Sequence, residues 1–378
     1  MKLMIIHPHL NVLGGSEILT RILIYELEAL GNEVIVLTGA RNEEAFPETS
    51  KVKYALIKDV ARGLKTQGNE LLRRLTNILY SIDEVLKKEE PETVLLMIQE
   101  PIYGVLTKAT NPKMGVSIYI HFPYEEELTK KNIEIFLKLY RFPGLYENLY
   151  RVIDLHITNS NYTASVLYKD FGVESNIVYP AVPWGFFTEE VDIKESRSNV
   201  IVNVGRFVPH KRQDLLVKWF KERIKPEVKD AKLYIIGIPD PRFMDYYERL
   251  KSMVAECEGV ELVDRALRPE EMAKYHREAK LYVHLRIGEP FGMAPVEAMS
   301  QGAIPILPRK SGLAEVIAHG RNGFLFNTDD EALNYIIRLL KTPNEELVKI
   351  RKSAYIKSLY FTPERFTLDV LNYMKILT

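Results

Sequence analysis

Residues Leu281–Leu307 read LYVHLRIGEPFGMAPVEAMSQGAIPIL, and they contain two apolar runs with a helix-like segment between them. The stretch opens with the apolar run Leu281–Leu285, and a second apolar run, Ile304–Leu307, closes it. Between the two runs, Pro295 suits the first turn of a helix and Gly302 suits the residue just after a helix ends. A buried strand, a helix and another buried strand in this order predict one unit of a parallel α/β sheet.

Apolar runs of similar length recur along the chain, with helical patterns between them. The runs are Lys2–His7, Glu33–Thr38, Lys53–Ile57, Thr93–Ile98, Gly115–His121, Leu155–Asn159, Asn176–Tyr179, Val200–Val204, Lys232–Ile236 and Val260–Val263. The clearest helical patterns are Ser16–Leu30, Glu70–Lys88, Glu125–Tyr150 and most of Asp329–Leu377. Most apolar runs are continuous rather than alternating, which is typical of strands with both faces covered by helices. The sequence therefore predicts the α/β class, with doubly wound, Rossmann-like domains.

The alternation of strand and helix patterns stops at Pro180–Ser198, a stretch with prolines, a glycine and a polar tract. Such composition is typical of a linker between domains. We therefore predict a first domain at residues 1–182, a linker at 183–198 and a second domain at 199–361. Two α/β domains that face each other would enclose a cleft.

Charge and cysteine content narrow the class of protein. The chain carries 51 Asp plus Glu residues against 51 Lys plus Arg residues. A dedicated nucleic-acid binder normally has a clear positive excess, so no nucleic-acid partner is expected. The single cysteine, Cys257, excludes a disulfide framework and a zinc site built from several cysteines. No run of 18 apolar residues and no signal peptide is recognised, so we expect a protein of the cytoplasm or of the cytoplasmic face of a membrane.

Two loops of the first domain are candidates for chemistry, because open α/β sheets bind ligands beyond the carboxyl ends of their strands. In His7–Glu17, the backbone N–H groups of Gly14 and Gly15 could approach an anion at the start of a helix. The alternative is a plain turn in which Ser16 caps that helix. His121 ends a predicted strand, where it could donate a hydrogen bond or act as an acid or base. The alternative is a histidine satisfied by nearby backbone.

Two loops of the second domain carry charged side chains after buried strands. In Val204–Asp214, Arg206 offers a planar fork and Lys211 a point charge, and two cations suit a diphosphate leaving group. The alternative is a solvated basic loop. In the stretch quoted first, Glu289 could grip sugar hydroxyls, and Glu297, on an apolar helix, could accept from both hydroxyls of a ribose. The alternative is that Glu297 pairs with an Arg or Lys elsewhere.

Three motifs together give the chain a family resemblance. They are the E-x7-E pattern Glu289–Glu297, the loop GRFVPHK at Gly205–Lys211, and GGSE at Gly14–Glu17. With the motifs in this order, nearly the whole chain resembles the retaining GT-B glycosyltransferases of family 4. Two shorter segments, IHFPY at Ile120–Tyr124 and VYPAV at Val178–Val182, are similar to mannosyltransferases that extend the lipid-linked oligosaccharide for N-glycosylation. The residues His284–Gly288 depart from the small polar run usual in the family.

The resemblance implies a role for each matched position. Arg206 and Lys211 would hold the diphosphate of a nucleotide-sugar. Glu297 would bind the ribose, Glu289 the transferred sugar, and His121 would sit beside that sugar. The other implied donor-binding residues are Gly15 and Gly205 in the glycine loops, Val263 and Leu267 near the base, and Phe291, Gly292 and Met293, whose backbone would contact sugar and phosphate. Residues 1–182 would be the acceptor side, with a C-terminal helix at about 362–378 packed back on them.

The expected reaction moves a hexose of the mannose or glucose type from a GDP- or UDP-sugar to a hydroxyl of a glycan or lipid-linked acceptor. No Asp-x-Asp motif occurs, so no metal and no cofactor besides the co-substrate are expected, and the two cations would neutralise the leaving group. Two other classes share this architecture: a cleft protein that binds a nucleotide-sugar without transfer, and a sugar-nucleotide epimerase. Residues 125–153 mix basic and aromatic side chains, which predicts peripheral membrane contact or, alternatively, an amphipathic helix packed on the first domain.

Overall fold

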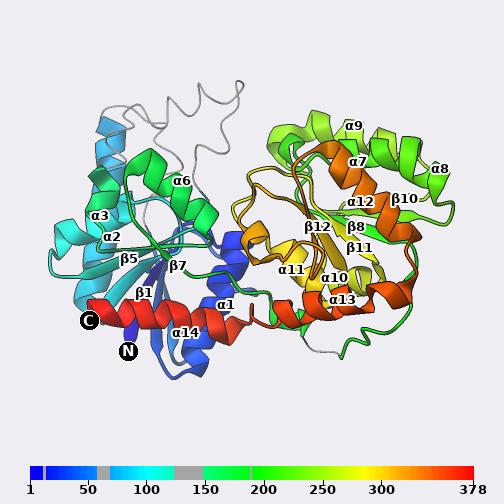
Figure 1. The fold of residues 1–378 in the computed structure, drawn as a ribbon. Helices are drawn as coiled ribbons and strands as arrows, with labels where there is room; N and C mark the ends of the chain where they lie inside the picture. The colour runs from blue at the N-terminus through cyan, green and yellow to red at the C-terminus, as the bar shows by residue number, and fades with distance from the viewer. Residues whose placement is uncertain (12–13, 58–68, 123–147, 188–189) are drawn as a thin grey trace. The chain divides into compact units, whose positions relative to one another are not determined.

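The structure is a computed structural model that describes residues 1–11, 14–57, 69–122, 148–187 and 190–378. The chain forms two compact units, each built on one parallel sheet (Figure 1). The N-terminal unit comprises Met1–Ala181 together with Pro363–Thr378, and the C-terminal unit comprises Val182–Thr362. The prediction of two Rossmann-like α/β domains is confirmed.

Seven parallel strands form the sheet of the N-terminal unit, in the order β3-β2-β1-β4-β5-β6-β7. Their bounds are β1 Lys2–Ile6, β2 Glu33–Thr38, β3 Val52–Leu56, β4 Thr93–Leu96, β5 Gly115–Ile120, β6 Leu155–Thr158 and β7 Asn176–Ile177. In β1, Leu3 and Ile5 join one cluster of buried side chains, while Met4 and Ile6 join another. Since successive side chains of a strand point to opposite faces, both faces of this strand are buried. This is why its apolar run is continuous.

Helices cover both faces of this sheet. They are α1 Gly15–Ala29, α2 Asn69–Glu89, α3 Ile102–Thr110, α6 Asn161–Phe171 and α14 Pro363–Met374. The last helix, α14, packs against α1, and its side chains Phe366, Val370 and Met374 join the cluster that contains Leu3 (Figure 1). Helices α3 and α6 are absent from the sequence predictions, because both are short and rich in Thr and Tyr, which are weak helix formers.

The start of α1 differs from the alternative reading of this loop, in which Ser16 caps the helix. Gly14 is the N-cap, and its N–H donates to the Oε2 atom of Glu17 at 3.0 Å. A glutamate three residues after the cap reaches back to the cap's own N–H group, so no serine side chain is needed there. Ser16 lies inside the first turn, where its carbonyl accepts from the Thr20 hydroxyl at 2.8 Å.

Six parallel strands form the sheet of the C-terminal unit, in the order β10-β9-β8-β11-β12-β13. Their bounds are β8 Val200–Val204, β9 Lys232–Ile236, β10 Val260–Val263, β11 Leu281–Val283, β12 Ile304–Pro308 and β13 Phe324–Phe326. β13 is absent from the predictions, because three residues are too few to show a periodic pattern. β11 ends at Val283 rather than at Leu285 as predicted, so His284 belongs to the loop that leads to Glu289.

The helices of the C-terminal unit follow its strands. The longer ones are α7 Gln213–Trp219, α9 Met244–Ala255, α10 Pro269–Glu278, α11 Met293–Ser300, α12 Asp329–Lys341 and α13 Asn344–Ser358. Short turns of helix occur at η2 Trp184–Phe186, η3 Pro209–Lys211, η4 Phe220–Ile224, α8 Lys225–Glu227, η5 Pro241–Phe243, η6 Leu313–Val316 and η7 Lys375–Leu377, the last in the N-terminal unit. As predicted, Pro295 lies in the first turn of α11, and Gly302 follows the helix with a φ of 81°.

The segment predicted as a linker is bonded into the C-terminal unit through two buried arginines. Arg351, on α13, donates from Nη1 to the carbonyl of Glu195 at 2.7 Å and from Nε to the carbonyl of Gly302 at 3.1 Å. Arg197 donates from Nη2 to the carbonyl of Gln301 at 3.1 Å. The guanidinium groups thus cap the carboxyl end of α11, where a positive charge is favourable, and hold the incoming chain against it.

Residues 123–147 lie outside the described ranges, and with them most of the predicted helix Glu125–Tyr150 and of the predicted membrane-contact segment 125–153. Membrane contact therefore stays a prediction. In the described parts of the chain, no helix is both long enough and apolar enough to cross a bilayer.

Arg351→Ala should lower the free energy of unfolding of the C-terminal unit by about 2–4 kcal/mol, because it removes the donor to the buried carbonyl of Gly302 and to the more exposed carbonyl of Glu195, and it opens a cavity. Chemical denaturation of the full chain measures this loss. Lys352→Ala, an exposed position on the same helix, is the control and should change stability by less than about 0.5 kcal/mol. Equal effects of the two substitutions would contradict the role given to Arg351.

Candidate active site

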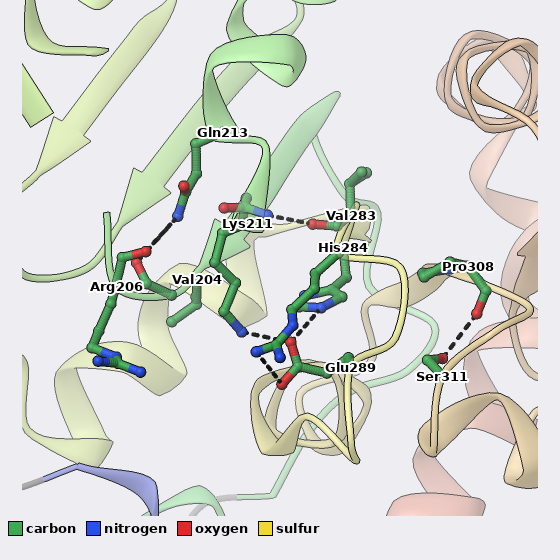
Figure 2. A network of polar contacts seen from close by, with 12 residues as sticks. Val204, Arg206, Lys211, Gln213, Val283, His284, Glu289, Pro308 and Ser311 are labelled. Atoms are coloured by element: carbon green, nitrogen blue, oxygen red, sulfur yellow. Dashed lines mark hydrogen bonds and ion pairs between the residues drawn. The ribbon is translucent and has the colours of Figure 1, made fainter. Parts of the chain in front are cut away.

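The carboxylate of Glu289 is the centre of a cluster of basic side chains in the C-terminal unit (Figure 2). Lys211, from the loop after β8, places its Nζ atom 2.6 Å from Glu289 Oε2. His284, from the loop after β11, places Nε2 3.0 Å from the same oxygen. Arg286 approaches the other carboxylate oxygen, with Nη1 3.7 Å from Glu289 Oε1. Loops from two neighbouring strands therefore meet at one buried carboxylate.

The charges of this cluster determine its protonation. Burial by itself raises the pKa of Glu289, but the charges of Lys211 and Arg286 and the hydrogen bond from His284 outweigh burial and hold that pKa well below its usual range. Burial lowers the pKa of Lys211, and Glu289 opposes that shift. Burial, followed by the charges of Arg286 and Lys211, lowers the pKa of His210 to about 3. The cluster therefore has a positive excess that suits an anion.

The backbone around Glu289 is held by glycines and by a neighbouring loop. Gly288 and Gly292 have φ angles of 77° and 87°, a region that side chains rarely adopt. A Cβ atom on Gly292 would lie 3.2 Å from Glu289 Cγ. The carbonyl of Glu289 accepts from the N–H of Gly312 at 2.8 Å. Gly292 is also the N-cap of α11, so the helix begins at Met293, beside the carboxylate.

The loop after β8 is shaped by close backbone contact. The side-chain amide of Gln213 donates to the carbonyls of Gly205 and Arg206 at 3.3 and 3.1 Å. A Cβ atom on Gly237, directly after β9, would lie 2.0 Å from the carbonyl oxygen of Gly205. The position of a Cβ atom on Gly205 is 3.4 Å from Lys211 Cδ, so the lysine side chain lies over this glycine.

Arg206 lies apart from the Glu289 cluster, and no ion pair joins its guanidinium group to that carboxylate (Figure 2). It donates to Asp240 Oδ2 at 2.9 Å, and 47% of its side chain is exposed. Hydrogen bonds from Arg242 keep the pKa of Asp240 at about 2, and the Arg206 charge adds to this shift. The two cations predicted to act together therefore have different carboxylate partners, and Arg206 is more exposed to solvent than Lys211.

Glu297 has a different environment from Glu289. It lies on α11 with 13% of its side chain exposed, and burial raises its pKa to about 7. In the described parts of the chain, the one basic side chain within 4.0 Å of its carboxylate is His276, at 4.0 Å from Nε2 to Oε2. The alternative in which Glu297 pairs with an Arg or Lys is therefore wrong for these residues.

The predicted base-binding and backbone positions lie at the same edge of the sheet. Val263 is the last residue of β10; its side chain is buried, and its carbonyl accepts from Gly237 at 3.0 Å. Leu267 is partly buried against the core. Phe291 is buried and packs on Phe361, with ring centroids 5.7 Å apart. Of this set, the backbone rather than the side chains of Val263 and Phe291 is what a ligand could contact.

The remaining predicted site residues, His121 and Gly15, belong to the N-terminal unit. The Nε2 atom of His121 lies 3.2 Å from the carbonyl of Met97, and burial lowers its pKa to about 4. Gly15 is exposed in the first turn of α1. His121 is thus satisfied by nearby backbone at one nitrogen, as the alternative had it, and the functional roles of both residues stay predictions.

The sequence analysis did not name several side chains of this arrangement as site residues. Arg286 and His284 stand where the family pattern is broken, so the departure was itself the signal. Asp240 follows β9, and the rule that chemistry lies after strands would have found it. His276 is on a helix face and gave no signal. Within the ranges that the structure describes, no group of three or more His, Cys, Asp or Glu side chains is arranged to hold a metal ion.

Comparison with known proteins identifies the class. Among solved structures, the fold is similar to Anabaena HepE in complex with UDP-glucose, with a TM-score of 0.77 at 17% identity over 100% of both chains. It is also similar to sucrose-phosphate synthase from Thermosynechococcus elongatus, with a TM-score of 0.78 at 16% identity over 100% of this chain and 98% of that one. Both likenesses are of fold, and the fold is GT-B.

Family models and curated relatives then narrow the class. The model "Glycosyltransferase Family 4" matches residues 13–183, and "Glycosyl transferases group 1" matches residues 187–357. The chain belongs to the family-4 glycosyltransferases, and it is an enzyme of that kind. It is 25% identical to the human alpha-1,3/1,6-mannosyltransferase ALG2 over 99% of this chain and 95% of the relative.

A second group of relatives matches over a shorter region. The chain is 27% identical to the GDP-Man:Man(3)GlcNAc(2)-PP-Dol alpha-1,2-mannosyltransferase of Dictyostelium discoideum over 64% of this chain. The match spans about half of that relative's own length, at 50%. The predicted family and the similarity to lipid-linked oligosaccharide mannosyltransferases are confirmed.

Gly237→Ala should lower the free energy of unfolding by about 1–3 kcal/mol, because the new Cβ overlaps the carbonyl of Gly205 and the two backbones must separate. The same separation moves the loop that carries Lys211, so nucleotide affinity should fall as well. Denaturant unfolding and calorimetric titration with GDP measure the two effects. Lys232→Ala, at the exposed start of β9, is the control, and an unchanged Gly237→Ala variant would contradict the close contact.

Glu297→Gln should change stability in a pH-dependent way. Because burial raises the pKa of Glu297 from 4.5 to about 7, the folded chain binds more protons than the unfolded chain between these values, and stability falls as the pH rises. Above pH 7, ionised Glu297 lowers the free energy of unfolding by about 3 kcal/mol. The free energy of unfolding of the variant should equal that of the wild type near pH 4 and exceed it by about this amount near pH 8.

Denaturant unfolding at both pH values tests this, with Glu248→Gln on the exposed face of α9 as the control. A gain in stability that is the same at both pH values would contradict burial of an ionisable group as its cause.

Proposed function

We propose that the chain transfers mannose from GDP-mannose to a hydroxyl of a lipid-linked glycan, with retention of anomeric configuration and without a metal ion. The names of the relatives support the sugar and the acceptor class: one is an alpha-1,3/1,6-mannosyltransferase, and another acts on a dolichyl-diphosphate glycan from GDP-Man. The alignment with the first spans 95% of that relative, so the likeness extends over both units.

The contact between Lys211 and Glu289 is the observation that carries the proposal. In a nucleotide-sugar, the hexose and the β-phosphate are joined at one oxygen. A site for it therefore needs a hydroxyl acceptor and a phosphate-binding cation side by side. Lys211 Nζ and Glu289 Oε2 are 2.6 Å apart, which meets this need. In the proposed complex, Glu289 accepts from hydroxyls of the mannose, and Lys211 bonds the β-phosphate.

Arg206 supplies the second charge. Its guanidinium group is half exposed and is bonded to Asp240, whose own charge is maintained by Arg242. Because Arg242 continues to neutralise Asp240, Arg206 can turn toward a diphosphate without leaving a buried carboxylate unpaired. A planar guanidinium also bonds two phosphate oxygens at once.

The ribose end of the donor is assigned to Glu297. Its carboxyl group is nearly buried on an apolar helix and has no Lys or Arg partner in the described ranges, so its oxygens are available to hydroxyl donors. The residues Phe291–Met293 lead from Glu289 into the helix, so we place their N–H groups between the sugar and the ribose. The order of residues along the loop thus matches the order of groups along a nucleotide-sugar.

The proposed chemistry is a front-face displacement. The acceptor hydroxyl oxygen forms a bond to the anomeric carbon of mannose as the bond from that carbon to the β-phosphate oxygen breaks. The hydroxyl proton passes to the departing phosphate oxygen. The products are the mannosylated acceptor and GDP, and the total charge is unchanged. The positive charges of Lys211 and Arg206 stabilise the developing negative charge of the diphosphate. Activity that survives chelation of divalent cations by EDTA is expected.

Support for the nucleotide base is divided, since the names of the alpha-1,2-mannosyltransferase relatives include GDP-Man whereas a structural neighbour was solved with UDP-glucose. Thermal shifts with GDP-mannose, GDP-glucose, UDP-glucose and ADP-glucose separate these choices. A ligand present at 100 times its Kd stabilises the folded chain by about 2.7 kcal/mol. Stabilisation by the UDP-sugar alone would reject the proposed donor.

Lys211→Met and Arg206→Met should each lower kcat/KM for mannose transfer by about 10²–10³-fold, because each removes a charge that stabilises the leaving group. Lys218→Met, an exposed lysine on the next helix, is the matched control and should keep full activity. Anomeric configuration of the product is read by NMR.

Two outcomes would overturn the proposal: unchanged rates for both variants, or release of GDP at an equal rate with and without acceptor. The second outcome would instead fit an epimerase-like enzyme.

A further inference from the structure

His276, in the last turn of α10, is a fully buried histidine with an unusual environment. None of its surface is exposed, and neither ring nitrogen has a hydrogen-bond partner among the described residues. The rings of Phe186 and Tyr282 lie on two sides of it, with centroid distances of 6.0 and 5.8 Å. A buried polar group without a partner is costly, so such a group calls for an explanation.

The carboxylate of Glu297 is the acidic group that approaches this imidazole. The distance from His276 Nε2 to Glu297 Oε2 is 4.0 Å, which is longer than a hydrogen bond, so a direct bond requires a side-chain movement of about 1 Å. Glu297 lies on α11, and α10 packs directly against α11, so the pair is held by two helices of the same unit.

We propose that His276 is a positioning residue for the ribose-binding carboxylate: its Nε2–H group donates to one oxygen of Glu297 and turns the other oxygen toward the ribose hydroxyls. The proposal rests on the proposed function, since it assigns the ribose to Glu297. A carboxylate that accepts from two hydroxyls and from one ring N–H has each of its oxygens bonded, which compensates for its burial.

Simple packing does not account for the imidazole. Phe186 and Tyr282 form an aromatic surrounding that a phenylalanine would fill equally well without any buried N–H group. Burial also lowers the pKa of His276 to about 3, so the ring is neutral and carries one N–H to donate. A neutral donor orients a carboxylate and leaves its negative charge available to the ribose, whereas a lysine or arginine would neutralise it.

The test compares nucleotides with and without the ribose diol. GDP and 2′-deoxy-GDP are titrated calorimetrically into the wild type, His276→Phe, His276→Gln and Glu297→Gln. The wild type should bind GDP about tenfold more tightly than 2′-deoxy-GDP, since one good hydrogen bond contributes about this factor to affinity. His276→Phe should lower the affinity for GDP about tenfold and leave the affinity for 2′-deoxy-GDP nearly unchanged. The ratio of the two affinities should therefore fall toward one, as it should in Glu297→Gln.

The amide nitrogen of glutamine can take the place of Nε2, so His276→Gln should restore part of the preference for GDP. A purely structural role would weaken both nucleotides equally and would not be rescued. In the wild type, GDP should also shift the ¹⁵N resonance of His276 Nε2 more than 2′-deoxy-GDP does, a measurement that needs no variant to fold.

The outcomes separate the two proposals. If GDP binds but its preference over 2′-deoxy-GDP is the same in His276→Phe as in the wild type, His276 does not position Glu297, and the proposed function stands. If the wild type binds neither GDP nor UDP, the proposed function fails, and the role of His276 fails with it.

Discussion

The contact between the buried carboxylate of Glu289 and the ammonium of Lys211 is the interaction on which the rest of the site depends. It joins the loop after β8 to the loop after β11, and His284 meets the same oxygen. A buried charge is tolerated only where opposite charges and hydrogen bonds compensate for its lost hydration. Lys211, Arg286 and Glu289 therefore constrain one another, and the two loops take the conformation that lets these side chains meet.

Two glutamates eight positions apart in one motif have opposite electrostatic environments. Cations surround Glu289 and keep its pKa well below the usual range, whereas Glu297 is buried without a cation and its pKa rises to about 7. The difference follows from position: the first lies in a loop at the sheet edge, and the second faces the apolar side of α11. One carboxylate is thus firmly charged and the other is easily neutralised, which suits two different groups of one ligand.

The architecture follows from patterns that are local in sequence. The continuous run Leu3–Ile6 indicates a strand buried on both faces, and the structure has it between two clusters of side chains. Pro295 and Gly302 delimit α11 because each has a backbone restriction that suits one end of a helix. β13 has too few residues to show a periodic pattern of apolar side chains, and it is recognised as a strand by its pairing with β12.

Residue type and short spacing were enough to predict most of the strands, the longer helices, the two α/β units and the loops that carry Arg206, Lys211, Glu289 and Glu297. They were not enough to predict which charges meet, because that depends on the folded chain. Lys211 and Glu289 are 78 positions apart, Arg206 and Asp240 34 positions, and His276 reaches Glu297 from a different helix. Two charged side chains interact when they lie close together in the folded chain. Strand order and helix packing set that distance, whereas separation along the chain does not.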